Sequence, residues 1–175
     1  MTGERETMTS LLAKITSNIR IRLARETDAE AISSLLFDSF VEYKSLYNPE
    51  SFAATAIPPD QIASRISEGP VWIAVADERI VGTASAIPKG DSLYVRGMAV
   101  LPGVRGRRTG ERLLTTVEQF ALMGGFRRML LSTTPFLDRA IHLYERFGFR
   151  RTNEGPHDLF GTPLFSMEKV ISNKL

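Results

Sequence analysis

A segment rich in glycine and arginine, residues 100–110, has the composition of an anion-binding loop. It reads Val-Leu-Pro-Gly-Val-Arg-Gly-Arg-Arg-Thr-Gly and precedes apolar residues at helical spacing (Leu113, Leu114, Val117, Phe120). The start of a helix presents unpaired N–H groups and the positive end of its dipole, glycines let the backbone approach a ligand, and arginines add positive charge. The segment therefore predicts a site for a compact phosphate-bearing ligand. It lacks the Gly-Lys-Ser/Thr of a P-loop and the spaced glycines of a dinucleotide-binding fingerprint, which disfavours ATP and NAD.

Two motifs, found in order along the chain, resemble those of a known family. Residues 98–102 (Met-Ala-Val-Leu-Pro) with residues 105–110 (Arg-Gly-Arg-Arg-Thr-Gly) are similar to the Arg/Gln-x-x-Gly-x-Gly/Ala acetyl-CoA signature of the GNAT superfamily of N-acetyltransferases. Residues 140–149 (Ala-x-x-Leu-Tyr-x-x-x-Gly-Phe) resemble its second motif. The likeness in architecture covers residues 19–171. There are two departures: Arg108 replaces the usual first glycine, and Leu137 replaces an asparagine that many members carry.

The resemblance implies acetyl-CoA as co-substrate and assigns residues to its binding. The backbone of Met98, Ala99 and Val100 would pair with the pantetheine arm as a neighbouring strand would. The pyrophosphate would be held by Arg105, Gly106, Arg107, Arg108, Thr109 and Gly110. The implied reaction is transfer of an acetyl group to a primary amine by direct attack in a ternary complex. No covalent enzyme intermediate is expected, because the chain has no cysteine and no motif that presents an activated serine.

Tyr144 resembles the motif tyrosine that lies near the cofactor sulfur in this family, and we expect it to be the general acid for the departing thiolate. A phenol has a pKa of about 10 and a thiol a pKa of about 8.5, so the phenol keeps its proton until the thiolate forms. Four residues remain open as the base that accepts the amine proton: Glu42, Glu50, Asp91 and His157. His142 lies about 200° round a helix from Tyr144 and is expected at the surface.

The elements that must position these residues follow from periodicity and from turn residues. We expect strands at 19–23, 71–76, 80–87, 93–100, 129–134, 149–153 and 164–171, and helices that follow Thr27, span 61–67, follow Gly110 and precede Gly148. A capping box is predicted at residues 27–30, and prolines should break any longer helix in residues 41–70.

The fold class is mixed α+β: a GNAT-like, mostly antiparallel sheet of six to seven strands, flanked by helices and splayed between the fourth and fifth strands. Gly97, inside the fourth strand, predicts a bulge that opens this cleft and leaves an N–H free for a developing oxyanion.

Composition and charge restrict the remaining possibilities. The chain has 175 residues, a net charge of +2 and no cysteine, and with only two histidines we expect no metal site. Residues 1–18 are expected to be a flexible N-terminal extension and residues 19–175 a single domain. No signal peptide or membrane span is recognisable, which favours a cytoplasmic protein with no membrane partner.

Charge is distributed unevenly along the chain. Residues 26–78 contain ten acids and two bases, whereas residues 96–151 contain eleven arginines and four acids. Within the first range, the acidic balance of residues 41–70 favours a cationic amine, either a small molecule or a peptide, as the acceptor. The arginine-rich residues 96–151 would suit a phosphate-bearing ligand. Two alternatives remain open: a CoA-binding regulatory or interaction module without turnover and, less favoured, a nucleic-acid-associated protein. A homodimer is also left open.

Overall fold

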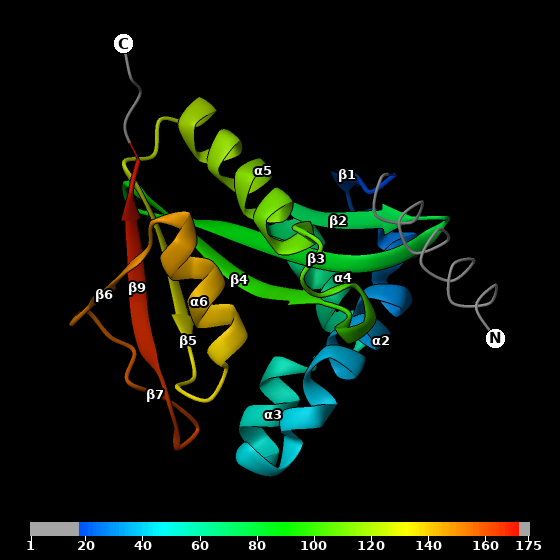
Figure 1. The fold of residues 1–175 in the computed structure, drawn as a ribbon, viewed down its shortest axis with the longest axis horizontal. Helices are drawn as coiled ribbons and strands as arrows, with labels where there is room; N and C mark the ends of the chain where they lie inside the picture. The colour runs from blue at the N-terminus through cyan, green and yellow to red at the C-terminus, as the bar shows by residue number, and fades with distance from the viewer. Residues whose placement is uncertain (1–17, 172–175) are drawn as a thin grey trace, which may run out of the picture.

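A twisted sheet of seven strands forms the centre of the molecule (Figure 1). The computed structural model describes residues 18–171. In spatial order the strands are β1 (Arg20–Leu23), β2 (Val71–Ala76), β3 (Arg79–Lys89), β4 (Ser92–Val100), β5 (Arg128–Thr133), β9 (Phe165–Val170) and β6 (Arg150–Thr152). All neighbours are antiparallel except β4 and β5, which are parallel. The predicted mixed, mostly antiparallel sheet is therefore confirmed.

Helices cover both faces of this sheet (Figure 1). The face in front in Figure 1 carries α5 (Thr109–Met123) and α6 (Asp138–Phe147), whose apolar sides pack on residues such as Leu93, Val95 and Met129. The opposite face carries α2 (Ala29–Phe40) and α4 (Pro59–Glu68), which enclose a second core with Ile73 and Val75. Every residue of β2 is buried, which explains its uninterrupted apolar sequence.

The parallel strands β4 and β5 pair only over a short stretch. Residues Ser92–Tyr94 face Arg128–Leu130, and beyond them the described residues show no pairing between the two strands. In β4, the register against β3 shifts between Thr83 and Ser85, so that Gly97 and Met98 together lie opposite one residue, with Gly97 at φ +60°. The predicted splay and the predicted bulge are both confirmed, and they lie on the same strand.

The proline-rich segment 41–70 holds more helix than its sequence predicted. It contains the 3-10 helix η2 (Val41–Leu46), α3 (Pro49–Thr55) and α4. Pro49 and Pro59 each occupy the first helical position, where the missing N–H has no intrahelical partner to lose. No long helix spans this segment, as predicted, but the expectation of a single short helix at residues 61–67 was wrong, because Pro49 and Pro59 start helices.

The predicted capping box at residues 27–30 was also wrong. A 3-10 turn, η1 (Glu26–Asp28), comes first, and α2 starts only at Ala29. The carboxylate of Asp28 accepts a hydrogen bond from the Arg25 N–H at 2.7 Å and forms an ion pair with Arg22 at 2.8 Å. Because the Asp28 carboxylate bonds to the chain before it rather than to the helix after it, α2 begins one residue later than predicted.

Two short elements complete the chain. A hairpin of β7 (Asp158–Leu159) and β8 (Thr162–Pro163) was not expected from the sequence, and it is joined to α3 by a hydrogen bond of 2.6 Å between the hydroxyls of Ser51 and Thr162. A 3-10 turn, η3 (Pro102–Val104), follows β4. The expected extension, residues 1–18, lies outside the described residues apart from Asn18. Within residues 18–171, no helix has both the length and the apolar character that crossing a bilayer requires.

Candidate functional site

The anion-binding loop predicted from the sequence connects β4 to α5 through η3. The first hydrogen bond of α5 runs from the Arg112 N–H to the Arg108 carbonyl at 2.9 Å, so the N–H groups of Thr109, Gly110 and Glu111 have no helical acceptor before them. Gly106 and Arg108 both adopt positive φ, +79° and +61°. Residues other than glycine rarely adopt a positive φ, so Arg108 occupies a position that a glycine would fill without strain. These turns direct the start of α5 toward the end of β4.

The side chain of Arg105 holds this loop in place. Its guanidinium donates to the Val100 carbonyl at 3.2 Å and to the Ser39 carbonyl at 2.8 Å, and it forms an ion pair with Glu42. Arg105 therefore links the loop to the end of α2 and to η2. Its charge is used within the protein, and its contribution to a ligand comes through the backbone that it fixes.

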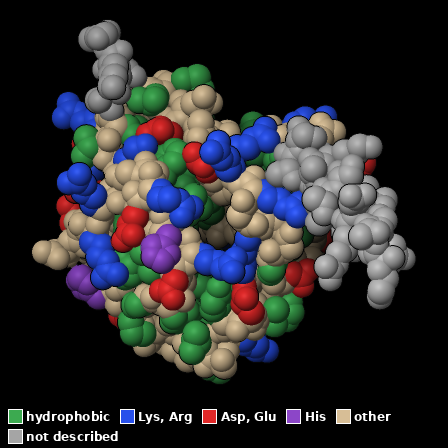
Figure 2. Space-filling model, in the orientation of Figure 1, with side chains coloured by type: hydrophobic (Ala, Val, Ile, Leu, Met, Phe, Trp, Pro, Cys, Tyr) green, Lys and Arg blue, Asp and Glu red, His purple; other side chains and the backbone are tan. Residues whose placement is uncertain are grey.

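A cavity of about 670 Å³ lies between this loop, the end of β4 and α6. Figure 2 shows a hollow in this face of the molecule with Lys and Arg side chains around it. Eight of the nine residues expected to bind the cofactor line the cavity, and Arg107 is the exception. The structure thus brings together the two segments, 98–100 and 105–110, that the resemblance had paired.

Tyr144 forms part of the wall of the same cavity. Its side chain is only 8% exposed and packs edge-on against Phe149, with ring centroids 5.9 Å apart. Burial, with smaller effects from Tyr47 and Tyr94, raises the pKa of the Tyr144 phenol well above its usual value near 10. Among the described residues no hydrogen-bond partner of its hydroxyl is found, so the phenol is a protonated donor available to a ligand.

The four residues expected as a base lie in different places. Glu42 adjoins the cavity through its ion pair with Arg105, which lines the cavity. Glu50 is exposed on α3, and His157 is exposed just before β7. Asp91 lies in the turn before β4, six residues from Gly97, which is a separation of ~20 Å at the rise of a strand. The structure therefore does not gather these four around one point.

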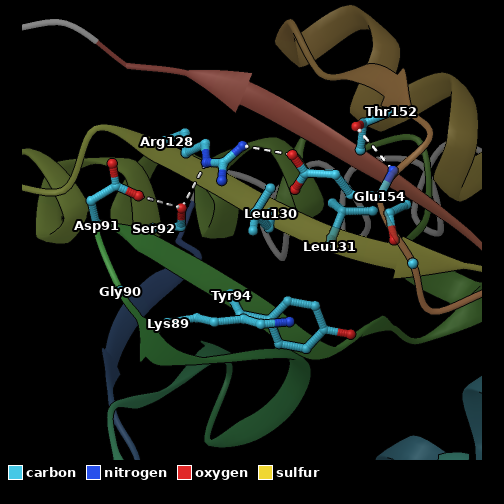
Figure 3. A pocket seen from close by; sticks show the side chains of 12 residues that line it. Lys89, Gly90, Asp91, Ser92, Tyr94, Arg128, Leu130, Leu131, Thr152 and Glu154 are labelled. Atoms are coloured by element: carbon cyan, nitrogen blue, oxygen red, sulfur yellow. Dashed lines mark hydrogen bonds and ion pairs between the residues drawn. The ribbon is translucent and has the colours of Figure 1, made fainter.

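Asp91 instead lines a second cavity of about 380 Å³ near the paired ends of β4 and β5 (Figure 3). In Figure 3, Lys89 and Tyr94 lie on one side of it and Arg128 and Glu154 on the other. Arg128 in its wall is engaged by carboxylates: its guanidinium contacts Glu154 at 3.4 Å and Glu168, outside the cavity lining, at 3.1 Å.

Sequence reasoning missed the contribution of α6 to the rim of the larger cavity. His142 is exposed, as expected, yet it lines this cavity together with Arg139 and Arg146. These residues recur at intervals of three and four, the spacing of one helical face, and that signal could have found them. Arg139 and Arg146, together with Arg108, place three guanidinium groups beside the loop.

Two hydroxyls in the cavity have no partner. Ser39 Oγ and Thr109 Oγ1 are buried, line the larger cavity and make no hydrogen bond within the described part of the chain. An unsatisfied buried hydroxyl destabilises a fold unless a ligand or water satisfies it. With the free N–H groups of α5 and the rim of cations, these donors fit a ligand that carries a diphosphate, such as acetyl-CoA. No three His, Asp or Glu side chains gather as metal ligands would within residues 18–171.

Comparison with known proteins agrees with this geometry. The model of the acetyltransferase (GNAT) family matches residues 30–149, more than half of the chain. The fold is similar to that of the PaiA N-acetyltransferase of Thermoplasma acidophilum, solved in complex with coenzyme A, with a TM-score of 0.76 at 18% identity over 88% of this chain and 99% of that one. The chain therefore belongs to the acetyltransferase (GNAT) family.

Curated relatives match over a shorter stretch. The probable N-acetyltransferase camello of Xenopus laevis is 36% identical over 84 residues, which cover 46% of this chain and 38% of that protein. The uncharacterized N-acetyltransferase YjgM of Escherichia coli (strain K12) is 33% identical over 82 residues, which cover 45% of this chain and 49% of that protein. The chain thus matches less than half the length of either relative.

Proposed function

We propose that this protein transfers an acetyl group from acetyl-CoA to a primary amine by direct attack in a ternary complex, and that residues 19–175 act as one domain. The observation that carries the proposal is the larger cavity itself. It joins the unpaired N–H groups at the start of α5, the bulged end of β4 and the Tyr144 phenol in one continuous space.

The loop and β4 would bind acetyl-CoA mainly through their backbones. Gly106, Arg108, Thr109 and Gly110 line the cavity at the start of α5, and their N–H groups would bind the pyrophosphate, with the Arg108 and α6 guanidinium groups adding charge. Because β4 has no β5 partner beyond Tyr94, the edge at Met98–Val100 is free to pair with the amides of the pantetheine arm. When bound there, acetyl-CoA supplies the activated acetyl thioester.

The protein's own contribution to the reaction would be electrostatic. An N–H freed by the bulge at Gly97 would stabilise the negative charge that develops on the carbonyl oxygen during attack. The Tyr144 phenol would hydrogen-bond to the departing sulfur and supply its proton. Its raised pKa keeps the phenol protonated as a hydrogen-bond donor to the sulfur, and the same shift makes it a weaker acid than a free phenol.

The acceptor amine must lose a proton to become a nucleophile. Glu42, Glu50, Asp91 and His157 stay candidates for this role, and Glu42 adjoins the larger cavity through Arg105. The acceptor would reach the bulge through the splay between β4 and β5, from the side of the sheet opposite α5 and α6.

Two measurements test the proposal together. Acetyl-CoA at about 100 times its dissociation constant should stabilise the fold by roughly 2.7 kcal/mol, seen as a rise in Tm. Release of free thiol should then depend on an amine drawn from a broad panel. No stabilisation by acetyl-CoA would overturn the proposal, and stabilisation without thiol release from any amine would identify a CoA-binding module instead.

A further inference from the structure

One arginine at the splayed strands has no role in the acetyl-CoA site described above. Arg65, on α4, reaches the bulge of β4 so closely that a Cβ atom placed on Gly97 would lie 2.6 Å from its Nη1. In β4, Leu93 and Val95 point into the core beneath α5, so the alternate residues Tyr94 and Arg96 point to the other face of the sheet. Arg65 lies on that other face, across the sheet from α5 and α6.

The Arg65 guanidinium has no partner within residues 18–171: no carboxylate lies within ion-pairing distance of it, and no acceptor takes a hydrogen bond from it. The Arg65 side chain is nevertheless partly buried. Burial and the nearby Arg96 lower the pKa of Arg65 from its usual value, while Glu68 and Tyr94 act in the opposite direction. The Arg65 nitrogen atoms are not among the buried unsatisfied groups, so they stay open to solvent and its five donors are free to bind a ligand.

The acid nearest to Arg65 is already in use. Glu68, one turn further along α4, forms an ion pair of 2.5 Å with Arg96. Arg96 keeps a buried Nε without a partner, so even this pair leaves a donor free. Two arginines and one carboxylate therefore leave a net charge of about +1 beside the bulge.

This arrangement reverses the expectation drawn from the acidic composition of residues 41–70. Glu42 is neutralised by Arg105 and Glu68 by Arg96, whereas Arg65, one of only two bases in that segment, has no ion-pair partner among residues 18–171. The sequence of residues 41–70 thus carries a net negative charge, whereas the structure has a net positive charge beside the bulge, where the acceptor would arrive.

We propose that Arg65 is a specificity-determining residue that binds a carboxylate of the acceptor, so that the preferred substrates are amines that carry a carboxylate, such as amino acids. The inference rests on the proposed acetyl transfer. Arginine presents a planar fork of donors that matches a carboxylate with two parallel hydrogen bonds. A carboxylate held there anchors the acceptor on the face opposite acetyl-CoA, beside the bulge.

The test compares matched acceptors in the thiol-release assay. Each of several amino acids is paired with its carboxamide, and aliphatic diamines are included as cationic acceptors. The wild-type protein should prefer the carboxylates. Arg65→Gln should lower kcat/KM for the carboxylates by about 30- to 100-fold, through a rise in KM, as expected for the loss of a charge-assisted pair. It should change kcat/KM for the carboxamides less than about threefold, and Arg65→Lys should fall between.

Arg79→Gln, at an exposed position at the start of β3, is the matched control and should leave all these ratios unchanged. Because Arg65 has no partner to lose, Arg65→Gln should keep or raise the Tm, whereas a structural arginine would lower it. Equal losses with carboxylates and carboxamides, or a wild-type preference for diamines, would overturn the carboxylate site while leaving acetyl transfer intact. Absence of turnover with every acceptor would overturn both.

Discussion

Arg105 and Glu42 form an ion pair that joins the loop before α5 to η2, 63 residues earlier in the chain. The same guanidinium also donates to the carbonyls of Val100 and Ser39. This arginine of the acetyl-CoA signature thus bonds to β4, α2 and η2 within the protein. Its function in the loop is to fix backbone N–H groups, which need no reorganisation when a phosphate arrives.

Replacing Arg105 should therefore weaken both the fold and ligand binding. Arg105→Ala removes two hydrogen bonds to carbonyls and a partly exposed ion pair, which should reduce the free energy of unfolding by about 2 kcal/mol. Glu42→Gln removes only the ion pair and should cost less than about 1 kcal/mol. Urea unfolding measures both, and calorimetry should show weaker acetyl-CoA binding for Arg105→Ala than for Glu42→Gln. Equal affinities would mean that the loop does not depend on Arg105.

Arg108 offers a test of backbone strain, because it adopts φ +61° where the family signature has glycine. Arg108→Gly and Arg108→Ala remove the same charge, but only glycine relieves the positive φ. The glycine variant should be more stable than the alanine variant by about 1 kcal/mol. Chemical denaturation of the two variants side by side gives this difference directly, and an alanine variant of equal stability would show that the position is not strained.

Tyr144→Phe removes the proposed proton donor without changing the packing against Phe149. The value of kcat should fall about 100-fold, at the lower end of the range for general acid catalysis. Stabilisation by acetyl-CoA should stay close to that of the wild type, since the phenol is not part of the phosphate site. A variant with unchanged kcat would remove Tyr144 from the mechanism.

The raised pKa of Tyr144 also predicts how stability depends on pH. In the unfolded chain this tyrosine loses its proton near pH 10, whereas in the fold it keeps it, so the unfolded state binds fewer protons and stability falls as pH rises above 10. Each such group contributes a slope of about 1.4 kcal/mol per pH unit. Burial also raises the pKa of Tyr47. Between pH 8 and 11, the free energy of unfolding should fall less steeply with pH in Tyr144→Phe than in the wild type. It should fall less steeply still when Tyr47→Phe is added. Identical slopes would contradict the predicted burial of the two phenols.

The sequence predicted the sheet better than the acceptor side, and the reason is physical. Strands such as β2 and helices such as α5 carry a periodic apolar pattern that only one arrangement can bury, and glycines at 97, 106 and 148 mark positions of positive φ. The cofactor loop could be predicted because it depends on a local turn and on one helix start. Its residues are close in sequence as well as in space.

The acceptor side depends on pairs of residues that are distant in sequence. Glu68 and Arg96 are 28 positions apart, and Arg65 reaches Gly97 only because α4 packs behind the splayed strands. No local pattern encodes such pairing, so the acidic composition of residues 41–70 indicates a sign of charge opposite to the one found beside the bulge. The helices that begin at Pro49 and Pro59 were under-predicted for a related reason. Composition alone does not distinguish a proline at the first position of a helix from one that ends a helix.

Gly97 and Gly90 separate the chemical role of the bulge from the conformational cost of positive φ. Gly90 lies at φ +63° in the turn before β4, where a Cβ atom would meet nothing within 4 Å, whereas Gly97 lies at φ +60° against the Arg65 guanidinium. Each substitution by alanine should reduce stability by about 1–2 kcal/mol through the left-handed backbone. Only Gly97→Ala also needs Arg65 to move and the bulge to change shape, which displaces the N–H proposed to face the thioester. Transfer activity should therefore drop by at least about tenfold in Gly97→Ala and stay near wild type in Gly90→Ala, as measured by thiol release. Comparable activity in the two variants would show that the bulge opens the sheet but takes no part in the reaction.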